Sequence, residues 1–143
     1  MKVFLLILIV GLTSAEYKIK NFNDLMLYHD ECGTENNTPA DALAKYKKQK
    51  YEANDASYCH IYCLSKKIGV FDDESGILVN NWVQQVVEAN HKTVDEIKPI
   101  IEKCATDIAQ FKENKCLWAF KGFMCTRQAG YEVIERKVKG KKY

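Results

Sequence analysis

The clearest pattern of apolar and polar positions in the chain lies in residues 79–87. Its apolar members stand at i, i+3, i+4, i+7 and i+8: Val79, Trp82, Val83, Val86 and Val87. In an α-helix these positions share one face. The segment is therefore predicted to be an amphipathic helix that buries this stripe.

Another helix is predicted after Thr93, because Thr93 and Glu96 have the spacing of a capping box. The apolar positions that follow share a face: Ile97, Ile101, Cys104 and Ile108. Pro99 falls within this pattern, and a proline inside a helix removes one backbone hydrogen bond. The helix is therefore expected either to bend at Pro99 or to begin its regular part after it.

Three shorter helices are predicted in the first 70 residues from their end signals. The first has apolar positions at helical spacing, Leu25, Tyr28 and Cys32, and is expected to stop at Gly33. The second is expected to begin at Thr38-Pro39, with Thr38 as its N-cap. The third is expected to begin at Asp55 and to end at Gly69. Residues 72–76 are predicted to form a turn. Alternating strand patterns are missing, so the fold class is expected to be all-α.

Residues 116–125 carry apolar side chains on nearly every side of a helix, and Lys121 is their only charge. A helix that is apolar all round is the central one in a soluble protein. After it, Tyr131, Ile134 and Val138 have helical spacing. This tail is expected to lie across the domain as a short lid.

Residues 1–15 have the features of a secretory signal peptide. A positive start at Lys2 precedes an apolar run from Val3 to Leu12, and small residues follow at 13–15. The run is about half of the ~20 residues that span a bilayer. We therefore expect a cleaved leader, residues 1–15, followed by one secreted helical domain, residues 16–143.

The charge balance argues against one class of partner. The chain has 21 basic and 19 acidic residues, and removal of Lys2 with the leader leaves 20 against 19. Nucleic-acid binding needs a concentrated basic face. Nucleic acid is therefore not expected as a partner.

Six cysteines in a secreted chain indicate three disulfides and no free thiol. Cys59 and Cys63 lie one helical turn apart, with Cβ atoms ~5–6 Å apart, whereas a disulfide needs ~3.5–4.5 Å. They should not pair with each other. Cys116 and Cys125 leave opposite sides of their helix and so need different partners. The spacing of Cys59, His60 and Cys63 fits no common zinc finger, so no metal is expected.

The spacing of the cysteines resembles that of a known family. The intervals are 26, 3, 40, 11 and 8 residues, from Cys32 through Cys59, Cys63, Cys104 and Cys116 to Cys125. With the leader and the helices, this pattern is similar to that of insect odorant-binding proteins, the pheromone and general odorant-binding family. Stretches at 16–20, 45–48 and 69–72 resemble its general odorant-binding subgroup of flies. The resemblance implies six or seven helices around an apolar cavity, with interlocked disulfides Cys32–Cys63, Cys59–Cys116 and Cys104–Cys125.

The resemblance also implies an extracellular carrier of odorants, pheromone-like volatiles or fatty acids. Because hydrophobic contact has no preferred direction, selectivity is expected to be broad. The candidates for the cavity wall are Phe71, Leu78, Trp82, Val86, Trp118, Phe120, Phe123 and Met124, and the candidates for its mouth are Tyr131 and Ile134. The alternative for each residue is ordinary core packing.

The main alternative function is a secreted, disulfide-stapled helical interaction or signalling protein without a small-molecule ligand. Hydrolase, phosphate-loop and zinc-protease motifs are missing, so neither an enzyme nor a cofactor is expected. A sensory receptor or a membrane surface is a possible partner, and the protein is expected to be a monomer or a weak homodimer. The histidines (His29, His60 and His91) are expected at the surface, with pH-dependent ligand release as the alternative.

Overall fold

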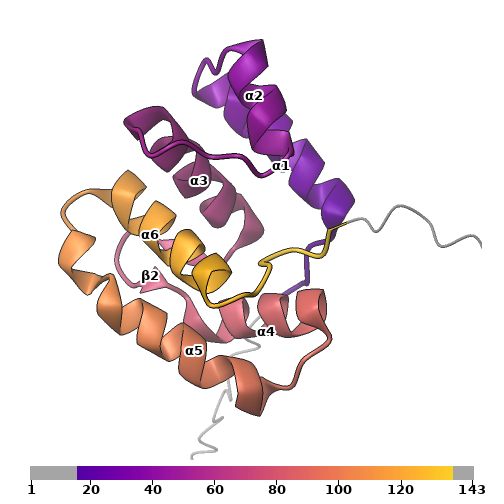
Figure 1. The fold of residues 1–143 in the computed structure, drawn as a ribbon, viewed down its shortest axis with the longest axis vertical. Helices are drawn as coiled ribbons and strands as arrows, with labels where there is room; N and C mark the ends of the chain where they lie inside the picture. The colour runs from indigo at the N-terminus through magenta and orange to yellow at the C-terminus, as the bar shows by residue number, and fades with distance from the viewer. Residues whose placement is uncertain (1–15, 137–143) are drawn as a thin grey trace, which may run out of the picture.

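Six α-helices account for most of the computed structural model, which describes residues 16–136 (Figure 1). They are α1 (Phe22–Glu35), α2 (Ala40–Lys47), α3 (Asp55–Ile68), α4 (Val79–Asn90), α5 (Val94–Asp107) and α6 (Lys115–Gln128), with a 3-10 turn, η1 (Ala109–Phe111), between the last two. The all-α fold class is thus confirmed. The predicted leader and Val138 lie outside the described residues. Within 16–136, no helix has the length and apolar character needed to span a membrane.

Helix α6 is central, as the sequence predicts. It packs along α3 and also contacts α5, η1 and the segment before α4, while α1 lies on the other side of α3 (Figure 1). The buried side chains of α6 include Trp118, Phe120 and Phe123. The stripe predicted for α4 is also confirmed in its centre, where Trp82, Val83 and Val86 are buried. These faces together form one apolar interior.

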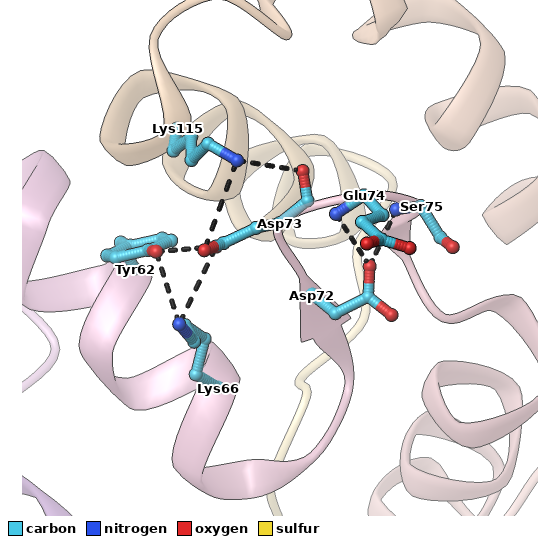
Figure 2. Close-up of polar contacts among 7 residues, drawn as sticks. All are labelled: Tyr62, Lys66, Asp72, Asp73, Glu74, Ser75 and Lys115. Atoms are coloured by element: carbon cyan, nitrogen blue, oxygen red, sulfur yellow. Dashed lines mark hydrogen bonds and ion pairs between the residues drawn. The ribbon is translucent and has the colours of Figure 1, made fainter.

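The predicted turn at 72–76 is the tip of a short hairpin. Strands β1 (Phe71–Asp72) and β2 (Gly76–Ile77) pair antiparallel, with Phe71 opposite Ile77. The Asp72 carboxylate accepts hydrogen bonds from the backbone N–H groups of Glu74 and Ser75, which closes the turn (Figure 2).

The hairpin tip is held between α3 and α6 by the side chains drawn in Figure 2. Tyr62 of α3 donates a hydrogen bond to the Asp73 carboxylate, and Lys115 of α6 donates one to the Asp73 backbone oxygen at 3.0 Å. Lys66 lies 3.6 Å from the same carboxylate. The contacts are exposed to solvent, so they position the hairpin more than they stabilise the fold.

The helix starts differ from the predictions by one or two residues. The capping box of Thr93 and Glu96 is present as predicted. Asn54 caps α3, however, and Asp55 is its first residue. The prediction that Thr38 caps α2 is wrong, because Pro39 is the N-cap and α2 has no side-chain cap. The Thr38 N–H bonds instead to the Gly33 carbonyl at 2.8 Å, which closes the end of α1.

The prediction that Gly33 ends the first helix is also wrong. Gly33 is buried inside α1, and a Cβ there would lie 2.9 Å from a methyl carbon of Leu43. The glycine therefore serves the close approach of α2 to α1. The chain turns instead at Asn37, in the left-handed conformation. Gln49 and His91 have the same conformation after α2 and α4, where glycine is the usual residue.

Helix α5 begins before Pro99 and continues through it. Of the two expected alternatives, a later start of the regular part is therefore wrong, and a bend at Pro99 stays a prediction. Pro99 lies in the second turn, so the Asp95 carbonyl is the group that loses an intrahelical partner. Both residues are exposed, and water can satisfy that carbonyl.

Three disulfides join the helices, in the pairing implied by the family resemblance. Cys32–Cys63 links α1 to α3, Cys59–Cys116 links α3 to α6, and Cys104–Cys125 links α5 to α6. The two geometric constraints from the sequence are confirmed: Cys59 and Cys63 do not pair with each other, and the two cysteines of α6 have different partners. No cysteine is free.

Candidate functional site

The apolar interior brings together most of the residues predicted to line a cavity. Seven of them are buried in one cluster: Phe71, Trp82, Val86, Trp118, Phe120, Phe123 and Ile134. Met124 and Tyr131 are partly buried and pack against this cluster. Leu78 is partly exposed, at the residue that precedes α4. Whether any of these side chains contacts a ligand stays a prediction.

Edge-to-face aromatic contacts organise the part of the interior near the hairpin. The Phe71 and Trp118 rings lie 5.2 Å apart at 80°, and Tyr62 meets the Phe71 ring at 6.0 Å. Such pairs favour this geometry because the positive edge of one ring meets the negative face of the other. The hairpin is thus packed against α6 through the indole of Trp118.

Gly76 allows that packing, so a side chain at this position is expected to destabilise the fold. Its φ is +71°, and an added Cβ would lie 2.2 Å from Cζ2 of Trp118. We expect Gly76→Ala to lower the free energy of unfolding by about 3 kcal/mol, from backbone strain and displacement of the indole. Urea denaturation followed by circular dichroism would measure it.

Gly130→Ala is the matched control for this prediction. Gly130 also has a positive φ, +93°, but an added Cβ would meet nothing within 4 Å. This variant should lose only the backbone contribution, about 1 kcal/mol. Equal losses in the two variants would show that the approach of Trp118 to Gly76 contributes nothing.

The cavity expected at the centre of the fold is a small internal void in this structure. Its volume is about 10 Å³, and it is lined by Leu25, Gln49, Ile68, Phe123, Glu132, Val133 and Ile134. Such a volume holds no more than one water molecule. Phe123 and Ile134 are the two predicted residues at this void. Around it, the rings of Phe120 and Phe123 on α6 pack against Tyr58 and Tyr51, at 4.5 and 5.9 Å between ring centres.

The segment after α6 closes one side of the void. Val133 and Ile134 are both buried, and sequence reasoning identified only Ile134. Asn90 holds the segment by donating to the Glu132 carbonyl at 2.8 Å and accepting from the Glu132 N–H at 3.0 Å. Residues 131–136 are not helical, so the helical spacing predicted for the tail does not extend through them.

Larger pockets lie at the surface. Four of them have volumes between about 410 and 650 Å³, and none is lined by any of the ten predicted residues. The largest is formed by the α1–α2 turn, α2 and the start of α3. Most of the residues that line it are polar or charged, but the wall that they present to it is more apolar than polar. Within residues 16–136, no group of three or more metal-binding side chains gathers in one place.

Five buried polar atoms inside the fold have no hydrogen-bond partner among the described residues. Two are ring nitrogens of His29 and His60, described below, and the other three are the indole nitrogens of Trp82 and Trp118 and the hydroxyl of Ser65. An unsatisfied buried donor costs about 1–3 kcal/mol. Each of these groups could recover that free energy by bonding to the oxygen of an alcohol, ester or acid that entered the interior.

Two of the three histidines lie in the interior, so the expectation that they are at the surface is wrong. Nδ1 of His29 is 2.8 Å from Nε2 of His60, and both side chains are fully buried. With Leu25 as position i, His29 is i+4 and Cys32 is i+7, so the helical pattern could have placed His29 on the buried face. His91 is exposed, as expected.

Burial lowers the pKa of His29 to about 3 and that of His60 to about 4, because the charged imidazolium loses its hydration. For His29 the nearby His60 lowers the pKa further. The pair is therefore neutral at pH 7. One ring nitrogen must donate and the other accept, and the outer nitrogens have no partner among the described residues.

Comparison with known proteins agrees with the cysteine pattern and the fold. The model of the PBP/GOBP family matches residues 14–129. This chain belongs to the PBP/GOBP family. It is 33% identical to odorant-binding protein 22 of Aedes aegypti over 140 residues. The aligned part covers 97% of this chain and 99% of that protein.

Two Drosophila melanogaster proteins of related name also match. General odorant-binding protein 99a is 35% identical over 139 residues, which are 96% of this chain and 97% of that protein. General odorant-binding protein 99b is 26% identical over 128 residues, which are 87% of this chain and 84% of that protein. The resemblance inferred from the cysteine spacing is thus confirmed. In this PBP/GOBP chain, the match includes α1 to α6 and ends before the segment that closes the void.

Proposed function

We propose that this protein is an extracellular carrier that binds small hydrophobic molecules in its apolar interior and transports them through aqueous fluid. The observation that carries the proposal is membership of the PBP/GOBP family, joined to one continuous apolar interior between α1, α3, α4, α5 and α6. The names of the relatives support odorants as a ligand class. Secretion rests on the leader pattern at residues 1–15.

The energetics favour a ligand of modest size. Full burial of a ten-carbon chain contributes roughly 8 kcal/mol, at ~0.8 kcal/mol for each methylene. The loss of ligand freedom and the ordering of side chains offset part of this gain. Affinities in the micromolar range follow, with selectivity set mainly by size and by the unpartnered indole N–H groups of Trp82 and Trp118.

Because the internal void is only about 10 Å³, a ligand must displace side chains that now fill the interior. The segment with Val133 and Ile134 is the part best suited to move. It contributes two buried apolar side chains, and its polar contacts come from Asn90 and from the exposed pairs His91–Glu135 and Gln49–Arg136, both at 3.3 Å. We propose that its outward movement opens the mouth, with Tyr131 and Ile134 at the rim.

The central experiment is displacement of a neutral fluorescent probe, such as N-phenyl-1-naphthylamine, from the delipidated protein. Alcohols, esters and fatty acids of about ten carbons should displace it at micromolar concentrations. Failure of the probe to bind at tens of micromolar would contradict the carrier proposal. That outcome would favour the alternative of an interaction or signalling protein.

Intrinsic fluorescence offers an independent prediction. Ligand binding should quench the emission of Trp118, which lies on the central helix α6 at the edge of the hairpin. The change should disappear in Trp118→Phe and persist in Trp82→Phe. The reverse result would place the ligand nearer to α4.

A receptor or membrane partner and a weak homodimer stay predictions.

A further inference from the structure

The turn between α1 and α2 contains the only Asn-x-Ser/Thr sequence of the chain, Asn36-Asn37-Thr38. This tripeptide is the acceptor for N-linked glycosylation in proteins that enter the secretory pathway. From the sequence alone, the adjacent Pro39 and the expected use of Thr38 as a helix cap argue against modification. In the structure the second objection disappears, because Pro39 is the N-cap of α2 and no side chain caps this helix. The Thr38 side chain is therefore not committed to the start of α2.

Asn36 lies where a bulky group can be attached. It is the C-cap residue of α1, and it stands with Glu35 and Asn37 on an exposed stretch of the chain. Asn37 turns the chain there with a left-handed backbone, φ +51°. The turn lies at the end of the molecule opposite α4 and α5 (Figure 1). An exposed turn of this kind is the usual structural context of a modified asparagine.

The side-chain amide of Asn36 has little to lose in the folded protein. Its nitrogen donates one hydrogen bond, to the Cys59 carbonyl at 3.5 Å, which is a long distance for such a bond. That carbonyl lies inside α3, where the helix supplies its regular partner. An amide nitrogen has two hydrogens, and glycosylation replaces only one of them. The folded structure is therefore compatible with a sugar on this nitrogen.

Asn36 also lines a surface pocket that contains a disulfide. The pocket has a volume of about 460 Å³, and we call it the disulfide pocket. Its lining residues are Glu35, Asn36, Cys59, Tyr62, Cys63, Lys66, Lys67 and Cys116. Cys59 and Cys116 are bonded to each other, and both are partly exposed. In each of the other two disulfides one cysteine, Cys32 or Cys104, is buried.

This arrangement makes Cys59–Cys116 the disulfide most open to attack by a thiol. Thiol–disulfide exchange begins when a thiolate reaches one of the two sulfurs, so its rate depends on access. The bond joins α3 to α6, the central pair of helices, so its reduction would weaken the middle of the fold. A bulky group on Asn36 would stand beside the sulfurs and restrict that access.

We propose that Asn36 carries an N-linked glycan that covers the disulfide pocket and slows reduction of Cys59–Cys116. The inference rests on the secretion proposed above and adds a modification site to it. The donor is an oligosaccharide linked to a lipid pyrophosphate. The bond from C1 of its first sugar to the pyrophosphate oxygen breaks, a bond from C1 to Nδ2 of Asn36 forms, and the lipid pyrophosphate leaves. Nδ2 gives up one proton, and nothing is oxidised or reduced.

The first test expresses the full chain, residues 1–143, in a mammalian cell line and measures the intact mass of the protein in the medium. The wild type should include a species that is heavier by a core oligosaccharide. Peptide N-glycosidase should remove the added mass and convert Asn36 to aspartate, which peptide mapping detects. Because Pro39 restricts the backbone of Thr38 to extended conformations, we expect a mixture of modified and unmodified molecules, and Pro39→Ala should raise the modified fraction.

Matched variants show whether the sequon directs the modification. Asn36→Gln removes the acceptor and Thr38→Val removes the hydroxyl, so both should lose the heavier species. Thr38→Ser keeps the hydroxyl, and Asn37→Gly keeps both the sequon and the left-handed turn, so both should retain it. A heavier species that persists in Asn36→Gln would place the modification elsewhere and overturn the proposal.

The second test measures the initial rate at which reduced glutathione opens each disulfide, by alkylation of the new thiols and peptide mapping. Reduction of Cys59–Cys116 should be about threefold slower in the glycosylated protein than after enzymatic removal of the glycan, since access limits the exchange. Cys104–Cys125 is the internal control, because neither of its cysteines lines the disulfide pocket, and its rate should not change. Equal rates for Cys59–Cys116 in the two forms would show that the glycan does not cover the pocket.

The outcomes separate this inference from the proposed function. A secreted wild type without the heavier species would overturn the glycan site and leave secretion and the carrier function untouched. A chain that stays inside the cells would contradict secretion, and the inference would fail with it. Removal of the glycan should leave probe binding unchanged, because no residue of the proposed mouth, residues 131–136, lines the disulfide pocket.

Discussion

Replacing Cys59 and Cys116 together by serine is expected to lower the free energy of unfolding by about 4 kcal/mol. The disulfide closes a loop of 57 residues, and it restricts the unfolded chain more than the other two bonds. It also joins α3 to α6, the pair of helices at the centre of the fold. Urea denaturation of wild type and variant under non-reducing conditions would measure the difference.

The matched control is the double serine variant of Cys104 and Cys125. That disulfide closes a loop of 21 residues, so the same relation gives a loss of about 3 kcal/mol. A larger loss for this variant than for the α3–α6 bond would show that loop closure does not set the order of the effects.

Acidification from pH 7 to pH 5 is expected to lower the free energy of unfolding by about 4 kcal/mol through the buried pair His29 and His60. Both pKa values are lowered in the folded protein, to about 3 and 4, whereas an unfolded histidine has a pKa near 6.5. Below pH 6.5 the unfolded chain therefore binds protons that the folded chain does not. Stability is full above pH 7 and falls as the pH drops from 6.5 towards 4.

The double variant His29→Leu/His60→Leu should remove this component of the pH dependence, because neither position then has an imidazole to protonate. Apolar replacement of both partners also leaves no unpaired polar group in the interior. His91→Gln should keep it, since this exposed position leaves the buried pair unchanged. Urea denaturation at pH 7 and pH 5 would compare the three proteins. An unchanged pH dependence in the double variant would assign the acid sensitivity to other groups.

The elements that the sequence predicted well are those with a periodic apolar face or a side-chain cap. The α4 stripe, the capping box before α5 and the central α6 could each be inferred from a few residues, because burial and capping depend on local spacing. The disulfide pairing needed the family resemblance. Local geometry excluded Cys59 with Cys63 but left other pairings open.

Tertiary contacts explain what the sequence did not predict. Gly33 resembles a helix stop, but it lies inside α1 because Leu43 of α2 packs against it. Gln49 and His91 end helices in a conformation that usually requires glycine, so no local signal marked them. The small volume of the void depends on Val133 and Ile134, which return to the interior from far along the chain.

The order of the disulfides along the chain has a consequence for survival in a fluid that contains proteases. The bonded intervals 32–63, 59–116 and 104–125 overlap, so together they enclose every peptide bond between Cys32 and Cys125. A single cut anywhere in this span leaves both pieces covalently attached. The two pieces of a nicked molecule would separate only after the disulfides that join them were reduced.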